Sequence, residues 1–218
     1  MGADVTSATV PYPLAKRVED KLVSIGLLVL LSPVFALAYG AMAGDMLLAR
    51  SDRGPWLYRE RRISRGREFE LLKLRTVRRD VLAAAQGREA HARLLEAEPA
   101  NLTWAGRRIL KPWYLDELPQ LFNVLRGDTS LVGPRPWPPS LVRSHVASGY
   151  DYRNRVIAGW TGPAQVQKGV TEPAGYTDLD LAYVEACRTR SGLRLAWLDL
   201  ELLWRTVKVM AKGEGLQF

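Results

Sequence analysis

The chain has 218 residues, enough for one domain with a membrane element but not for a second independent domain. Lysine and arginine together number 31 against 23 aspartate and glutamate, and the formal net charge of +8 favours anionic partners such as phosphate, nucleic acid or lipid headgroups. The single cysteine, Cys187, excludes an intramolecular disulfide, and the 2 histidines leave little for a zinc site.

The first strong pattern along the chain is an uncharged apolar run from Leu22 to Gly44. As a straight helix it would rise roughly 34 Å, enough to cross a bilayer core of about 30 Å. Residues 1–13, which are small, polar and proline-containing, are expected to form a flexible tail before it. The run is longer than the core of a signal peptide and lacks a convincing cleavage signal, so we favour a retained membrane element over a signal peptide.

The flanks and the middle of this run predict a re-entrant membrane helix over residues 14–49. Basic residues stand on both sides, with Lys21 before the run and Arg50 after it, so the positive-inside bias places both ends on the cytoplasmic side. Near the middle lies Ser32-Pro33, where proline removes a backbone donor and bends the helix. The alternative is an ordinary transmembrane helix with a proline kink.

The remainder, residues 50–218, is expected to form one membrane-associated α/β unit that is mostly helical with a small β-hairpin. Its first part, residues 50–80, is strongly basic, which is typical of a surface attracted to anionic lipid. Within this part, Trp56-Leu57-Tyr58 and residues 69–74 predict two short strands around a turn at Gly66.

Three helices are predicted further along the chain. Residues 81–98 are rich in helix-forming residues and end before a proline. Residues 116–126 place apolar side chains on one helical face, and Gly127 marks the C-terminal end. Residues 193–208 alternate apolar and charged side chains, which suits either a helix lying in the bilayer interface or an ordinary helix packed on a core.

The segment Leu115-Asp116-Glu117-Leu118-Pro119-Gln120 is the first candidate for chemistry. Proline fits only the first turn of a helix, so Asp116 and Glu117 are predicted at a helix N-terminus, where free N–H groups stabilise carboxylates and attract phosphate. One carboxylate could then attack phosphorus while the other holds a hard cation such as Mg²⁺. A simple capping role for Asp116 is the alternative.

A second candidate is Arg135, which lies within Gly133-Pro134-Arg135-Pro136. Prolines on both sides restrict the backbone, so the guanidinium is presented from a stiff, extended segment. The planar fork of arginine binds phosphate oxygens at two points. Arg135 is therefore a candidate phosphate ligand, although a purely structural turn stays open.

In combination, these motifs resemble the bacterial sugar transferase family, the monotopic phosphoglycosyl transferases, over roughly Lys16 to Lys212. The resemblance rests on an ordered set of segments, namely Asp116-Glu117-Leu118-Pro119-Gln120-Leu121, Asn123-Val124, the Gly-Pro-Arg-Pro block, the Ser32-Pro33 break, Lys73-Leu74-Arg75-Thr76, where the family usually has Lys-Phe-Arg-Thr, and residues 159–166.

The resemblance implies a re-entrant membrane helix joined to a small catalytic unit on the cytoplasmic face of the inner membrane, with Mg²⁺ as cofactor. In the family, the aspartate of the Asp-Glu pair attacks the β-phosphate of a UDP-sugar, releases UMP and forms a phosphosugar–enzyme intermediate. Polyprenyl (undecaprenyl) phosphate then accepts the phosphosugar, which initiates polysaccharide or glycoconjugate synthesis.

Carried onto this chain, the family's roles fall on residues that the physical argument also selects. The resemblance implies Asp116 as nucleophile and Glu117 as the carboxylate linked to Mg²⁺. It also implies that Lys73, Arg75 and Arg135 bind phosphate. Phosphoryl transfer depends on positioned cations more than on acid–base groups, so the two lines of argument agree.

Two departures from the family pattern concern sugar and nucleotide contacts rather than the nucleophile. Lys111 stands where the family pattern leads us to expect an arginine, and Pro163 replaces the customary tryptophan. Lys111 stays in the candidate substrate-binding set together with Gln165, and Lys168 is a weaker candidate. The chain resembles the minimal catalytic form, and we therefore expect it to be without the extra N-terminal membrane domain of larger family members.

Two other classes of protein stay open at this stage. A non-catalytic, basic, membrane-anchored binding module accounts for the charge and the anchor, with aromatics such as Trp56 to stack bases, but leaves the Asp116-Glu117 pair unexplained. A conventional glycosyl transferase would release UDP instead of UMP. We expect a UDP-sugar, polyprenyl phosphate and membrane lipid as partners and no nucleic acid, and the residues specify neither the sugar nor whether the chain forms a homo-oligomer.

Overall fold

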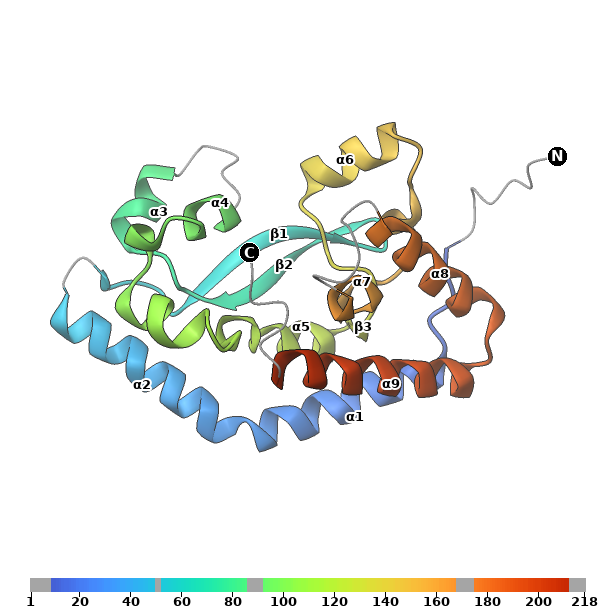
Figure 1. Ribbon diagram of the computed structural model, residues 1–218, viewed down its shortest axis with the longest axis horizontal. Helices are drawn as coiled ribbons and strands as arrows, with labels where there is room; N and C mark the ends of the chain where they lie inside the picture. The colour runs from blue at the N-terminus through green and yellow to red at the C-terminus, as the bar shows by residue number, and fades with distance from the viewer. Residues whose placement is uncertain (1–8, 50–51, 86–91, 168–174, 212–218) are drawn as a thin grey trace. The chain divides into compact units, whose positions relative to one another are not determined.

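The computed structural model describes residues 9–49, 52–85, 92–167 and 175–211 (Figure 1). In chain order the α-helices and strands are α1 (Leu14–Leu30), α2 (Ser32–Leu48), β1 (Leu57–Ser64), β2 (Arg67–Leu74), α3 (Arg79–Ala85), α4 (Ala92–Glu96), α5 (Gln120–Arg126), β3 (Ser130–Val132), α6 (Pro139–Ala147), β4 (Gly159–Thr161), α7 (Pro163–Val166), α8 (Tyr176–Thr189) and α9 (Gly192–Ala211). The shorter turns are η2 (Pro99–Asn101), η3 (Gly106–Leu110), η4 (Leu115–Glu117) and η5 (Tyr152–Asn154), of which η3 is π-helical. The described part is therefore mostly helical with two small sheets, as expected.

The N-terminal apolar run forms two helices, α1 and α2, which meet at Leu31 (Figure 1). Ser32 Oγ donates to Val29 O at 2.8 Å, and Pro33 occupies the first turn of α2, where its missing N–H leaves no helical bond unmade. Among the described residues, no single helix is long and apolar enough to span a membrane, whereas α1 and α2 together meet that test as a pair bent by 58°. The break falls directly before the predicted Ser32-Pro33.

The chain divides into two compact units. Unit 1 comprises Met1–Ile25, Arg61–Glu70 and Leu121–Phe218, and unit 2 comprises Gly26–Glu60 and Leu71–Gln120. Helix α1 and both strands of the β1–β2 hairpin therefore pass from one unit into the other. The predicted domain boundaries, after residues 13 and 49, divide the chain by membrane contact instead and stay predictions.

The β1–β2 hairpin turns at Arg65 and Gly66, whose φ angles of 52° and 73° are both left-handed. Two successive left-handed residues form the type I′ turn, whose twist matches that of antiparallel strands. The prediction of two short strands around Gly66 is confirmed, and the first strand extends to Ser64.

Unit 1 contains the parallel pair β3–β4, in which Ser130 lies opposite Gly159 and Val132 opposite Thr161. The backbones approach closely here, because a Cβ added to Gly159 would lie 2.0 Å from the backbone nitrogen of Gly133. Only glycine fits at this position.

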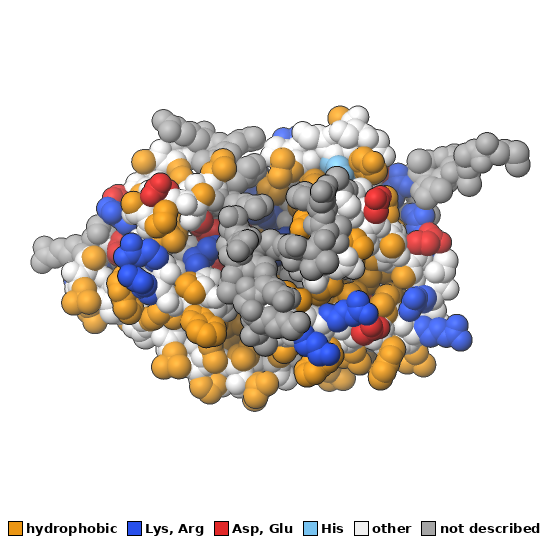
Figure 2. Space-filling view, viewed as in Figure 1, with side chains coloured by type: hydrophobic (Ala, Val, Ile, Leu, Met, Phe, Trp, Pro, Cys, Tyr) orange, Lys and Arg blue, Asp and Glu red, His pale blue; other side chains and the backbone are white. Residues whose placement is uncertain are grey.

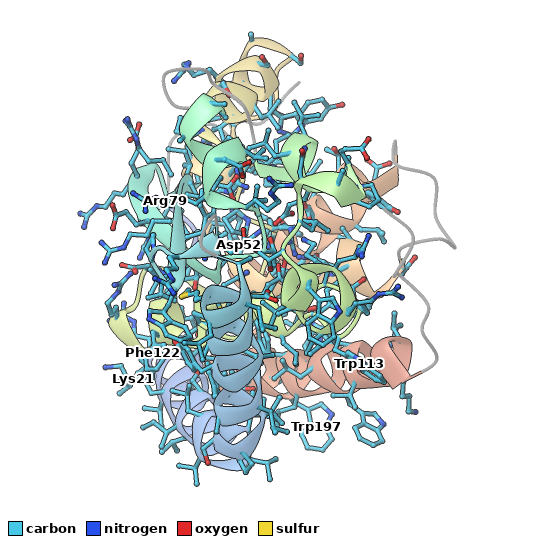
Figure 3. The ribbon with its side chains drawn as sticks, turned by 90° about the vertical axis from the view of Figure 1, so that its left-hand side faces the viewer. Lys21, Asp52, Arg79, Trp113, Phe122 and Trp197 are labelled. Atoms are coloured by element: carbon cyan, nitrogen blue, oxygen red, sulfur yellow. The ribbon has the colours of Figure 1, made fainter. Side chains whose placement is uncertain are left out.

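Helix α9 of unit 1 has one buried side and one exposed apolar side. Leu195 and Leu202 are buried, and Asp199 between them forms a buried ion pair with Lys16. The exposed stripe consists of Leu193, Trp197, Leu200, Trp204 and Val207. Figure 3 shows Trp197 pointing away from the helix. The predicted apolar stripe is thus largely exposed, which suits a helix lying in the bilayer interface, and that placement stays a prediction.

Unit 2 is built around α2. Its core consists of buried residues from three elements, Ala38 and Met42 of α2, Leu74 of β2 and Leu110 of η3. Asp45 at the end of α2 accepts a hydrogen bond from the backbone N–H of Ala105 at 2.8 Å, which ties α2 to the start of η3. Helix α2 also exposes apolar side chains such as Leu37 and Leu48, and hydrophobic side chains gather along this helix in Figure 2.

Candidate active site

The Asp116 segment begins with an irregular helical turn in unit 2. The backbone N–H of Lys111 donates to Gly106 O at 3.0 Å, which is the five-residue step of a π-helix. Tyr114 follows with a φ of 54°, a left-handed conformation that costs a non-glycine residue roughly 1 kcal/mol. Such local strain is typical of segments that present functional side chains.

The predicted helix over residues 116–126 is wrong at its start, because α5 begins at Gln120 and Asp116 lies in the separate 3₁₀ turn η4. Leu118 N–H donates to Leu115 O at 3.2 Å, the three-residue step. Pro119 has no N–H to make the four-residue step from the same carbonyl, so the two turns do not merge. The predicted end is confirmed, since Gly127 follows Arg126 with a left-handed φ of 81°.

Asp116 is 1% exposed and lies beside an ammonium group shared between two carboxylates. Lys111 Nζ is 3.4 Å from Asp116 Oδ2 and 2.7 Å from Glu96 Oε2. Glu96 is held in place by Thr76, whose hydroxyl donates to Glu96 Oε1 at 2.9 Å. Lys111 is therefore positioned by Glu96 and offers only a longer contact to Asp116.

Burial raises the pKa of Asp116 to about 6, since an anion loses its hydration inside the protein. Lys111 and Lys73 oppose this shift, whereas Glu117 and Glu96 add to it by repulsion. Burial also disfavours the charged form of Lys111, yet Asp116 and Glu96 outweigh it and raise the pKa of the ammonium. At neutral pH the Asp116 carboxylate is therefore ionised, but its charged form is less favoured than that of an exposed aspartate.

Lys73, a predicted phosphate-binding residue, belongs to the same cluster through its charge. It is 8% exposed, and its Nζ lies 3.9 Å from Glu60 Oε2. Glu60 and Lys73 are diagonal neighbours across the hairpin, a spacing that long side chains can bridge. The charge of Lys73, like that of Lys111, lowers the pKa of Asp116.

Arg75, the other predicted phosphate-binding residue of unit 2, is turned to the backbone instead. It is 2% exposed, and its guanidinium donates to Pro55 O and Val77 O, both at 2.9 Å, and to Asp52 O. Three carbonyl groups on two segments are thereby satisfied by one side chain. The contacts give Arg75 a part in folding this loop, and its predicted binding of phosphate stays a prediction.

Of the other predicted substrate-binding residues, Arg135 and Gln165 lie in unit 1, and Lys168 falls outside the described residues. The carbonyl of Arg135 accepts a hydrogen bond from Arg153 at 2.7 Å. Gln165 lies in α7, and both polar atoms of its side chain are buried without a hydrogen-bond partner among the described residues. A buried amide of this kind has donor and acceptor capacity available for a ligand.

Within the described residues, no three histidine, cysteine, aspartate or glutamate side chains gather into a metal-binding group. An all-protein cage is therefore not present in that part of the chain. Asp116 and Glu117 do supply adjacent carboxylates, and Mg²⁺ commonly binds through one or two carboxylates together with phosphate oxygens of a substrate. The donor set fits a cation that arrives with its phosphate ligand.

Two site residues, Glu96 and Glu60, were not predicted from the sequence. Glu96 sits in α4, twenty positions before Asp116, and reaches the site only through tertiary packing. The proximity of Glu60 to Lys73 could have been predicted, because a two-residue turn at Arg65 and Gly66 places the two residues diagonally across the hairpin.

A buried carboxylate beside a held cation suits an enzyme that transfers phosphoryl groups, because such enzymes rely on positioned positive charge. Comparison with known families agrees with this class: the model of the bacterial sugar transferase family matches residues 11–213. The chain belongs to this family, and the resemblance drawn from its motifs is confirmed.

Several curated proteins are similar over nearly the whole chain. An exopolysaccharide production protein of Sinorhizobium fredii is 39% identical, over 93% of this chain and 88% of its own length. A UDP-glucose:undecaprenyl-phosphate glucose-1-phosphate transferase of Caulobacter vibrioides is 34% identical, over 93% and 69%. A UDP-N-acetylgalactosamine-undecaprenyl-phosphate N-acetylgalactosaminephosphotransferase of Aeromonas hydrophila is 29% identical over 94% of this chain, which spans only 45% of that protein.

Proposed function

We propose that this protein transfers a sugar 1-phosphate from a UDP-sugar to undecaprenyl phosphate at the cytoplasmic face of the membrane, releases UMP, and thereby initiates polysaccharide synthesis. The observation that carries the proposal is the family match over residues 11–213, together with the buried Asp116 beside Lys111. The names of the relatives support both substrates. A bent apolar helix pair suits a lipid acceptor.

Asp116 is the proposed nucleophile. Its carboxylate oxygen forms a bond to the β-phosphorus of the UDP-sugar while the bond from that phosphorus to the bridging oxygen breaks, and UMP leaves with the electron pair. A phosphate oxygen of undecaprenyl phosphate then attacks the same phosphorus and releases the Asp116 carboxylate. Burial helps this chemistry, because a poorly hydrated carboxylate gives up less solvation on attacking phosphorus.

Lys111 and Lys73 are the proposed phosphate-binding cations beside Asp116. Positive charge held in place before the reaction stabilises the charge that develops on the transferred phosphoryl group. Lys111 enters this role with its ammonium already oriented by Glu96 at 2.7 Å. Arg135 and Gln165 are proposed as further substrate contacts from unit 1.

Glu117 is the proposed carboxylate for Mg²⁺, with substrate phosphate oxygens as the other ligands. When bound, the cation would offset the repulsion between the carboxylates and the pyrophosphate. Glu117 lies directly after Asp116 and influences its pKa, so its charge acts on the same site.

The experiment measures the nucleotide released when purified protein is mixed with Mg²⁺, undecaprenyl phosphate and a panel of UDP-glucose, UDP-galactose and UDP-N-acetylgalactosamine. The parent is expected to release UMP from at least one sugar, and Asp116→Asn is expected to release none above background. The matched control is Asp178→Asn, an exposed aspartate of α8, which should retain parental activity. Release of UDP would show a conventional glycosyl transferase, and undiminished UMP from Asp116→Asn would remove the nucleophile from the proposal.

A further inference from the structure

Arg153 is a buried arginine of unit 1 that the motifs of the family resemblance do not include. It lies in η5 and is 7% exposed. Its Nη1 donates to the carbonyl of Arg135 at 2.7 Å and its Nη2 to Asp180 Oδ2 at 2.7 Å. The centre of the guanidinium stands 3.9 Å from the centroid of the Trp137 ring, a cation–π distance. One side chain thus contacts both Arg135 and Trp137 of the Arg135 segment, residues 134–137.

The Arg135 segment depends on donors from other elements to hold its backbone. Pro134 and Pro136 have no N–H, so the segment cannot pair as a regular strand. Gly159 N donates to Pro134 O at 2.9 Å, and Ile63 N donates to Trp137 O at 2.9 Å. Between them, Arg153 supplies a hydrogen bond to the carbonyl of Arg135 itself. The carbonyls of Pro134 and Trp137 are thus held by backbone N–H groups, and that of Arg135 by a side chain.

Asp180 of α8 orients Arg153. Asp180 is 1% exposed, and its Oδ2 also accepts a hydrogen bond from the hydroxyl of Tyr152 at 2.9 Å. A buried ion pair adds little net stability, because desolvation offsets much of the attraction. With good hydrogen-bond geometry, its main effect is to fix the orientation of the two side chains. The guanidinium is therefore confined between Asp180, the Trp137 ring and the Arg135 carbonyl.

We propose that Arg153 is a positioning residue: it fixes the backbone from which the Arg135 side chain is presented to the pyrophosphate of the nucleotide sugar. The inference rests on the proposed function and extends it to a residue that never touches substrate. This role requires a side chain that donates two directed N–H hydrogen bonds and at the same time lies against the Trp137 ring. Lysine supplies a single point charge and cannot replace that geometry.

The test is a double-mutant cycle on UMP release, with the UDP-sugar that the parent turns over. Arg153→Lys is expected to raise KM for the UDP-sugar by about tenfold with a change in kcat of less than about threefold, as expected when a binding contact is misplaced. Arg135→Ala is expected to raise KM by at least as much. In the Arg135→Ala background, Arg153→Lys should add less than about twofold, since its effect passes through Arg135.

Arg155→Lys is the matched control. Arg155 lies in the same segment and is also bound to an aspartate, with its Nε 2.8 Å from Asp151 Oδ2. Its substitution should leave KM for the UDP-sugar within about twofold of the parent, since this ion pair lies outside the Arg135 segment. Should Arg153→Lys fail to fold, Asp180→Asn takes its place in the cycle, with a smaller increase in KM that again disappears in the Arg135→Ala background.

An equal KM penalty for Arg153→Lys in both backgrounds would overturn the inference, as would an unchanged KM in a folded Arg153→Lys protein. These outcomes differ from failure of the proposed function, which shows as no UMP release by the parent. If Arg135→Ala has the parental KM while the parent releases UMP, the role of Arg135 and this inference fall together and the transferase activity stands.

Discussion

At the scale of single residues, burial disfavours the ionised form of the Asp116 carboxyl group. Its pKa is raised from 3.8 to about 6, so the folded protein binds this proton more tightly than the unfolded chain does. Stability linked to Asp116 is therefore greatest at low pH and is lost as the pH rises through about 6. About two pKa units correspond to roughly 3 kcal/mol at pH 7.

Asp116→Asn is accordingly expected to make the protein more stable at pH 7, by up to about 3 kcal/mol, while it abolishes transfer. Asparagine resembles the neutral acid and avoids burying a charge. Denaturant unfolding of parent and variant in detergent, at pH 7 and pH 4, measures the difference. The gain should shrink toward pH 4, where the parent carboxyl is protonated. A variant less stable than the parent at pH 7 would contradict the argument.

Arg75 offers a second prediction, because its donors serve the backbone. Arg75→Met leaves the carbonyls of Asp52, Pro55 and Val77 without that partner, and each buried unsatisfied carbonyl costs about 1–3 kcal/mol. A loss of about 3 kcal/mol or more in the free energy of unfolding is expected. The control is Arg79→Met, an exposed arginine nearby, with an expected change below about 0.5 kcal/mol. Equal unfolding midpoints for the two variants would show that Arg75 has no such structural part.

How far the residues of the site could be predicted depends on how their partners are reached. Asp116 and Glu117 stand next to one another in the chain, so their adjacency was visible in the sequence. Arg75 stands two positions after Lys73 in the same motif, yet only the positions of three backbone carbonyls decide that it faces the loop. Glu96 has no local signal, because its partner Lys111 is reached by tertiary packing.

At the scale of elements, two glycines have left-handed backbones but different surroundings, Gly66 in the hairpin turn and Gly127 after α5. Their substitution by alanine separates the cost of the backbone conformation from the cost of a steric clash. Gly66 has a φ of 73°, and a Cβ there would lie 3.0 Å from Asn154 O, whereas Gly127 has a φ of 81° and open space. Gly127→Ala should cost about 1 kcal/mol for its left-handed backbone alone. Gly66→Ala should cost more, by about another 1 kcal/mol, because the neighbouring carbonyl must also move. Unfolding midpoints of the two variants measure the difference, and equal losses would contradict the steric part.

Elements were predictable where a local rule decides the outcome. The break before Ser32-Pro33 and the turn at Gly66 follow from what proline and glycine do to a backbone. The start of α5 was misjudged because Pro119 was placed within a single helix, whereas the chain makes a 3₁₀ turn first. The pairing of β3 with β4 joins residues far apart in the chain, such as Ser130 and Gly159, and three-residue strands carry too little pattern to show it.

At the scale of the whole molecule, the re-entrant topology remains a prediction with a direct measurement. Thr9 and Arg53 are exposed positions on either side of the α1–α2 pair. Single cysteines at these positions, in a Cys187→Ser background, are expected to react with a membrane-impermeant thiol reagent only from the cytoplasmic side. Right-side-out and inside-out vesicles distinguish the sides, with a periplasmic cysteine protein as control. Reaction of the two positions from opposite sides would establish a spanning helix.

The division into two units has a consequence for how proteins of this kind can be recombined. The chain changes unit at Ile25, Glu60, Glu70 and Gln120, and three of these points lie inside α1, β1 or β2. Neither unit is a continuous stretch of sequence, so no single junction between two relatives exchanges one unit intact. A chimaera made by one crossover mixes both units at once. Exchange of one intact unit between two relatives would therefore need several junctions, most of them inside a helix or a strand.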